Sequence, residues 1–155
     1  MKNKTDYEKT LFTYKVVKES TGVTYGSNSL NSPEIAAQFM EEYYKDYFAE
    51  DKEAFSVLLL NVKNKVIGIK TVSVGTLDVS IVHPREVFKA AILNSAKSIM
   101  IFHNHPSGDT TPSREDINLT KRLVDAGNLL GIKVLDHIIL GDNGKYLSMV
   151  GAGWM

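Results

Sequence analysis

Two histidines and an aspartate lie within fourteen positions of this chain, close enough to form a metal site. His103 and His105 follow the apolar run 98–102, which predicts a buried strand. Side chains two positions apart on a strand point to the same face, so both imidazoles should project side by side. Zinc binds imidazole nitrogens and carboxylate oxygens about 2 Å away. Asp116 is therefore the candidate third ligand, and the set predicts a hydrolytic metal site.

The segment before Asp116 also has a purely structural interpretation. Ser113 lies three residues earlier and makes a variant of the helix capping box, in which a serine and an acid satisfy free backbone N–H groups. Residues 106–112 contain two prolines and a glycine, so they should turn the chain and bring this helix start to the end of the histidine strand. A hydroxyl at a helix start can cap and still face the site. The capping and metal interpretations are therefore compatible.

The elements expected to hold these residues alternate between strand and helix. Hydrophobic periodicity and turn residues predict strands over 11–18, 55–60, 66–74, 98–102, 132–140 and 145–149, and helices over 33–48, 84–94 and 113–130. In the first helix, an apolar stripe is expected at Ile35, Phe39, Tyr43 and Phe48. The pattern indicates an α/β class, with a mixed β-sheet flanked by helices. Residues 1–50 should form an N-terminal strand and helix that pack on a core of residues 51–155, within one compact domain.

The composition excludes several kinds of function. Of the 155 residues, 43% are hydrophobic and 23% are charged, as in an ordinary globular protein. Eighteen basic and eighteen acidic residues cancel, so the charge does not favour nucleic acid or an anionic membrane as a partner. The absence of cysteine excludes disulfides, thiolate ligands and a thiol nucleophile. No signal sequence or apolar run of membrane-spanning length is evident, so the expected location is the cytoplasm.

The residues around the histidines resemble a known family. The run His103-Asn104-His105-Pro106, followed by Ser113 and Asp116, resembles the motif of the JAMM, or MPN+, metalloproteases. The wider context is similar to the bacterial RadC-like JAB branch of that family, through Gly75-Thr76, Pro84-Arg85-Glu86 and Leu135-Asp136-His137. The resemblance covers roughly residues 50–141. It implies a JAB/MPN fold, a cytidine-deaminase-like α/β/α sandwich, and a zinc ion held by His103, His105 and Asp116.

The resemblance also implies the catalytic roles. In the family, a glutamate at the head of an earlier strand acts as the base through the bound water, and the matching residue here is Glu53. Glu86 is the rival carboxylate, although an acid in the first turn of a helix already interacts favourably with the helix dipole. Ser113 takes the role of stabilising the oxyanion. We therefore expect a zinc metallopeptidase that cleaves a peptide or isopeptide bond in a protein or peptide.

Two other functions stay open. The family is associated with DNA repair, which makes a nuclease an alternative, but two-metal nuclease sites usually gather more carboxylates than this chain places near the histidines. The first fifty residues also show no Gly-rich hairpin between two short helices, the segment that usually precedes the catalytic domain in full-length relatives. The second alternative is a non-catalytic module that binds DNA or protein. His137 is expected to be a hydrogen-bonded residue that supports the site rather than a metal ligand.

Overall fold

The computed structural model describes residues 29–47, 52–75 and 82–155. The elements in these ranges are α1 (Pro33–Tyr47), β1 (Glu53–Leu60), β2 (Val66–Gly75), α2 (Pro84–Leu93), β3 (Ser98–Asn104), α3 (Arg114–Leu130), β4 (Lys133–Leu140) and β5 (Tyr146–Ser148). Every element predicted within the described ranges is confirmed, with each end within two residues of its expected place. The strand predicted over 11–18 lies outside the described residues. The division of the chain at residue 50 stays a prediction.

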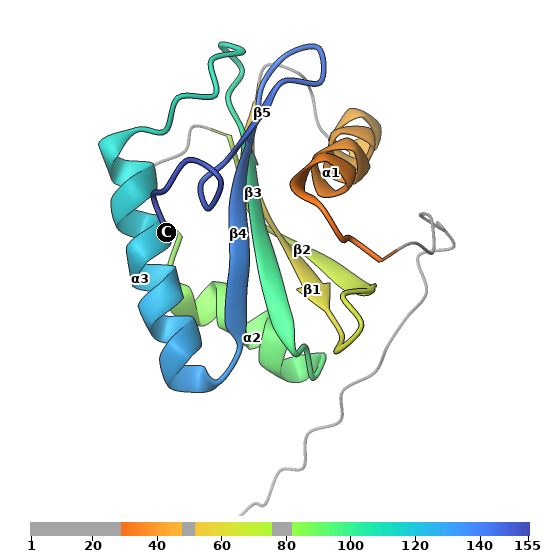
Figure 1. Cartoon of the computed structure of the whole chain (residues 1–155), viewed down its shortest axis with the longest axis vertical. Helices are drawn as coiled ribbons and strands as arrows, with labels where there is room; N and C mark the ends of the chain where they lie inside the picture. Colours follow the sequence, from red (N-terminus) through yellow and green to blue (C-terminus); the bar gives the residue numbers. More distant parts are fainter. Residues whose placement is uncertain (1–28, 48–51, 76–81) are drawn as a thin grey trace, which may run out of the picture.

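The described strands form one mixed sheet between two layers of helix. The strand order is β2-β1-β3-β4-β5, and only the central pair, β3 and β4, is parallel. A parallel pair needs a crossover connection, which α3 supplies. Figure 1 shows α1 on one face of the sheet and α2 and α3 on the other. The α/β prediction is therefore confirmed. None of the described helices has the length and apolar content to cross a membrane.

Each face of the sheet has its own hydrophobic core. Alternate side chains of β1 point to opposite faces, so Phe55, Val57 and Leu59 enter the core beneath α2 and α3. Ala54, Leu58 and Leu60 enter the core beneath α1. Because both faces are covered, β1 is a nearly continuous run of apolar residues rather than an alternating one. The sheet is therefore covered by a hydrophobic core on each face.

The apolar stripe predicted for α1 is wrong by about one position. Ile35 is 42% exposed, and Phe39 is only partly buried, whereas Ala36, Met40 and Tyr44 are buried against the sheet. The Tyr44 hydroxyl lies within hydrogen-bond distance of two carbonyl oxygens, that of Ala54 at 3.1 Å and that of Phe102 at 3.3 Å. The aromatic periodicity of this helix is ambiguous by one residue, and only the sheet beneath it selects the buried face. Phe48, the last member of the predicted stripe, lies outside the described residues.

Gly127, near the end of α3, allows the helix to pack closely on the segment that leads into β4. A β-carbon there would lie 2.5 Å from the carbonyl oxygen of Ile132 and 3.2 Å from Cζ of Phe88. We expect Gly127→Ala to lower the free energy of unfolding by about 1–3 kcal/mol, although alanine is the better helix former. Denaturant unfolding measures the change, with Asn128→Ala at the exposed neighbouring position as the control. A variant as stable as the wild type would contradict the close packing.

Candidate metal centre

The two histidines of the predicted site lie at the end of β3, on the face that packs beneath α3. His103 is the register partner of Phe55, and their rings stack with centroids 6.1 Å apart. His103 is fully buried, whereas the His105 side chain is 15% exposed. The strand period of two therefore places both imidazoles on one face, as the sequence predicts, and one of them stays open to the solvent.

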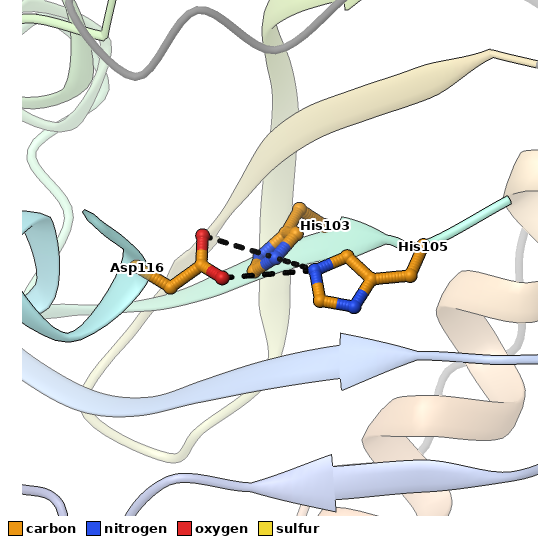
Figure 2. Close-up of side chains that lie close together, drawn as sticks. All are labelled: His103, His105 and Asp116. Atoms are coloured by element: carbon orange, nitrogen blue, oxygen red, sulfur yellow. Dashed lines mark hydrogen bonds and ion pairs between the residues drawn. The ribbon is translucent and has the colours of Figure 1, made fainter. Parts of the chain in front are cut away.

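The side chain of Asp116 meets both imidazoles at the start of α3. Nε2 of His103 lies 2.9 Å from Nε2 of His105. The Asp116 oxygens Oδ1 and Oδ2 lie 3.4 Å from His103 Nε2 and 3.6 Å from His105 Nε2, respectively. Figure 2 shows the three side chains converging from β3 and α3. With one ligand atom taken from each residue, the three atoms lie within 4.8 Å of one another, so this group could hold a metal ion.

The Asp116 side chain caps α3 and faces both imidazoles. The backbone N–H and the hydroxyl of Ser113 both donate to Oδ2 of Asp116, at 2.8 and 2.7 Å, and the Asp116 N–H donates back to the Ser113 hydroxyl. This reciprocal pair is the capping box expected at the start of α3. The box fixes the Asp116 side chain, while its carboxylate still faces the imidazoles. The expected capping box is therefore present, and it leaves the carboxylate available to the predicted metal site.

The loop between β3 and α3 brings the capping box to the strand end. The His105 N–H donates to the carbonyl of Leu140, which ties the start of the loop to the end of β4. Gly108 has a φ of 77°, a conformation that favours glycine, and a β-carbon there would meet the side chain of Asp142. The loop therefore packs against the turn after β4, which fixes its return path toward α3.

The hydrogen bond at Nδ1 of His105 leaves its other ring nitrogen, Nε2, directed at the cluster. Nδ1 of His105 lies 2.6 Å from the carbonyl oxygen of Asp109, and a carbonyl can only accept. Nδ1 must therefore carry a proton, so Nε2, the atom nearest His103 and Asp116, holds a lone pair when His105 is neutral and a second proton when His105 is charged. The neutral form is the tautomer that binds a metal through Nε2.

The charges of the cluster favour a bound cation. Burial by itself raises the pKa of the Asp116 carboxyl. The His103 and His105 imidazoles and the Ser113 hydroxyl lower this pKa by a larger amount, so the net pKa lies below the ordinary range. The Asp116 carboxylate raises the pKa of His105 against the opposing effect of burial, and the Asp109 carbonyl and the Glu53 charge add to it. A buried carboxylate that stays ionised beside two imidazoles attracts either a proton or a metal ion.

Glu53, the candidate base, lies on β1. Phe55 is the register partner of His103, and Glu53 lies two residues before Phe55 on the same strand. Glu53 is half-buried at the first position of the strand, and its charge contributes to raising the pKa of His105. Glu86 lies instead in the first turn of α2, where it is exposed and pairs with Arg85 at 3.5 Å. The electrostatic contact with His105 favours Glu53 over its rival as the candidate base.

Asn104 holds the backbone on both sides of Glu53. Its side chain points away from the cluster, as expected from its place between the histidines. Its Oδ1 accepts from the N–H of Ala54 at 2.7 Å, and its Nδ2 donates to the carbonyl of Lys52 at 2.9 Å. One amide group therefore fixes the chain immediately before and immediately after the candidate base.

We expect Asn104→Ala to move Glu53 and to lower any hydrolytic turnover, while leaving the three ligands in place. Loss of two hydrogen bonds should reduce kcat by about 10-fold to 100-fold, because small displacements of a positioned group are costly. Steady-state kinetics and zinc content measure the two effects separately. Asn94→Ala, at the end of α2, is the matched amide control. Unchanged kcat in Asn104→Ala would mean that this clamp does not matter for catalysis.

A cleft opens beside the exposed edge of His105. It encloses about 460 Å³ and is lined by residues of α1 and of the turns after β3 and β4, among them Glu41, Tyr44, Asn104 and Asp142. His105 is the one member of the three-residue cluster among the lining residues. The cleft therefore leads to the cluster from the side of α1 and offers room for an extended segment of another molecule.

Three contacts of the site were not anticipated from the sequence. The Asp109 carbonyl orients His105, Thr120 contacts His137, and Asn104 fixes the segment of Glu53. Thr120 alone has a local signal, because it lies four residues after Asp116 and so shares its helix face. His137 is fully buried and bonded to His103, in agreement with the supporting role expected for it. The other contacts depend on pairing between distant strands and loops.

The fold and the cluster define a class of protein. A mixed sheet between helices, with a His/His/Asp group at the end of a central strand, describes an α/β domain with a possible metal site. Residues 30–154 match the model of the RadC-like JAB domain, and the chain belongs to that family. The resemblance found in the histidine motif is therefore confirmed.

Many relatives share this domain. The chain is 58% identical over 132 residues to a UPF0758 protein of Caldanaerobacter subterraneus, which covers 84% of this chain and 55% of the relative. It is 54% identical over 124 residues to a UPF0758 protein of Desulforamulus reducens, and this match covers 80% of this chain and 53% of the relative. The chain thus spans about half the length of the relatives it matches. JAB domains include hydrolases, whereas the names of these relatives state no activity.

Proposed function

We propose that this protein is a zinc-dependent hydrolase that cleaves a peptide or isopeptide bond in a protein or peptide. The observation that carries the proposal is the convergence of His103 Nε2, His105 Nε2 and an Asp116 oxygen within 4.8 Å of one another, beside a cleft. Three protein ligands leave a fourth position of a tetrahedral ion for water, as in catalytic rather than structural zinc sites.

The remaining chemistry is assigned to Glu53. A bound zinc ion would lower the pKa of its water to about 7 and polarise the scissile carbonyl. The Glu53 carboxylate, whose charge helps to raise the pKa of His105, would take the proton from the attacking water and deliver it to the leaving amine. The cleft of about 460 Å³ beside His105 would hold the substrate chain.

Ser113 has two candidate roles that differ in their hydrogen bonds. Its hydroxyl donates to Asp116 Oδ2 at 2.7 Å, so it holds a proposed ligand in place. Donation to an oxyanion, the role implied by the family resemblance, requires the hydroxyl to rotate away from Asp116. We propose that Ser113 first orients the ligand and donates to the oxyanion only when substrate is bound.

The test combines metal analysis with two kinds of substrate. Purified protein is analysed for metal after dialysis against zinc, and then incubated with a mixture of unstructured peptides and isopeptide-linked peptides. Single-stranded and double-stranded DNA serve as the substrates of the nuclease alternative. We expect about one zinc per chain and cleavage of amide bonds that a chelator abolishes and zinc restores.

Each outcome decides between the candidate functions. DNA cleavage without peptide cleavage would replace the proposal with the nuclease alternative. A full complement of zinc with no hydrolysis of either substrate would favour a non-catalytic binding module. Absence of bound zinc at saturating concentrations would overturn the metal site itself.

A cytoplasmic location stays a prediction, and fractionation of cells that express the protein measures it directly.

A further inference from the structure

A chain of hydrogen bonds leads from the candidate metal site into the core. Nδ1 of His103 lies 2.7 Å from Nε2 of His137, and Nδ1 of His137 lies 2.6 Å from Oγ1 of Thr120. All three side chains are fully buried, so no water competes for these contacts. His137 comes from β4 and Thr120 from α3, whereas His103 comes from β3. This series of hydrogen bonds therefore joins β3, β4 and α3 next to the proposed ligand His103.

Thr120, the innermost residue of this series of hydrogen bonds, determines the direction of each bond in the series. Oγ1 of Thr120 lies 2.6 Å from the carbonyl oxygen of Asp116, which can only accept, so the hydroxyl must direct its single proton there. If the proton pointed elsewhere, two oxygens would face each other at 2.6 Å without a hydrogen between them. Met149 Sδ, at 3.3 Å, is a weaker acceptor and does not change this. Toward His137, the hydroxyl can therefore only accept.

The proton positions of both imidazoles follow from that constraint. Since Thr120 accepts, Nδ1 of His137 carries a proton and donates it. A fully buried imidazole is neutral, because burial disfavours its charged form, so Nε2 of His137 carries only a lone pair. His103 must then donate from Nδ1 to His137. Neutral His103 keeps a lone pair on Nε2, which faces Nε2 of His105 at 2.9 Å and can accept a proton from charged His105 when no metal ion is bound.

We propose that the buried pair His137 and Thr120 fixes the tautomer of His103, so that its Nε2 lone pair is presented to a metal ion at the His103, His105 and Asp116 cluster. His137 and Thr120 act as positioning residues and touch no substrate. The proposal rests on the metal site of the proposed function but not on its peptidase activity. A second feature supports it, because Thr120 also donates to the backbone of Asp116, so one hydroxyl is bonded to the helix turn of one ligand and to the orienting partner of another.

The direct test is the tautomer of His103 in the metal-free wild-type protein. Two-bond ¹H–¹⁵N correlation spectra of histidine rings distinguish a protonated Nδ1 from a protonated Nε2. We expect His103 and His137 both to carry the proton on Nδ1. A His103 proton on Nε2 would overturn the proposal, whether or not the protein later proves to be a hydrolase. The tautomer can be measured, and decides the proposal, even if the protein cleaves none of the peptide substrates.

Variants of Thr120 test the consequence for the metal. Thr120→Val keeps the shape but removes the acceptor of His137, so His137 should no longer hold His103 in one tautomer. We expect zinc affinity, measured by competition with a chelator, to fall about 10-fold to 100-fold, as for other residues that orient metal-bound histidines. Thr120→Ser should restore both the affinity and the ring spectrum, since it restores the hydroxyl. Wild-type affinity and an unchanged His103 tautomer in Thr120→Val would overturn the proposal.

A control separates orientation from packing. Met149 is fully buried and its sulfur contacts Thr120, so Met149→Leu disturbs the same pocket without removing the hydroxyl. We expect Met149→Leu to bind zinc like the wild type. Loss of zinc affinity in Met149→Leu equal to that in Thr120→Val would assign the effect to packing and contradict the proposal. If Thr120→Val does not fold, the wild-type ring spectrum still decides.

Discussion

Replacing Glu53 by glutamine should lower hydrolytic turnover by about 10²-fold to 10⁴-fold while the protein keeps its zinc. The range is that of general acid–base catalysis by a positioned carboxylate. Glutamine has nearly the same shape and can occupy the same half-buried position at the start of β1, but it cannot take up a proton. The three proposed ligands lie on β3, in the residue that follows the end of β3, and on α3, so their contacts with one another do not require Glu53. The effect should therefore appear in kcat and not in metal content.

The matched control for this variant is Glu86→Gln. Glu86 is the other candidate base, but it is exposed in the first turn of α2 and pairs with Arg85. We expect wild-type turnover from Glu86→Gln. If Glu86→Gln loses activity and Glu53→Gln keeps it, the assignment of the base is reversed. Loss of zinc in Glu53→Gln would instead mean that this carboxylate supports the metal rather than the proton transfer.

The second large effect is expected from His105→Ala, which should lower zinc affinity by more than about 100-fold. That figure exceeds the range for residues that only orient ligands, because this variant removes a proposed ligand itself. The His105 side chain is partly exposed and Asp116 remains capped by Ser113, so the metal-free variant should fold. Zinc should raise the melting temperature of the wild-type protein but not that of the variant, since only bound metal stabilises the folded state.

His83→Ala is the control for the loss of an imidazole. His83 is exposed at the start of α2, and its side chain makes no capping hydrogen bond there. Its replacement should leave both zinc affinity and the zinc-induced thermal shift unchanged. An equal loss in the two variants would indicate nonspecific binding of zinc by histidines. A full thermal shift retained in His105→Ala would remove His105 from the ligand set.

The elements and the ligand candidates could be predicted because their signals are local in the chain. The alternation of β3 puts residues 103 and 105 on one face whatever the strand pairs with. Ser113 and Asp116 are three residues apart and form their capping box within one turn of helix. Gly131 ends α3 in the left-handed conformation, with a φ of 70°, as a glycine at that place predicts. These features involve neighbours within a few residues, so the sequence alone determined them.

The tertiary structure decided what lies between distant segments. The predicted buried face of α1 is wrong by one position, since Ile35 and Ala36 could both begin an apolar stripe and only contact with the sheet selects one of them. The contacts of Asn104 with Lys52, and of His103 with His137, join residues 52 and 34 positions apart. Such contacts depend on strand register and helix packing, which are set by the burial of both faces of the sheet together rather than by any short run of residues.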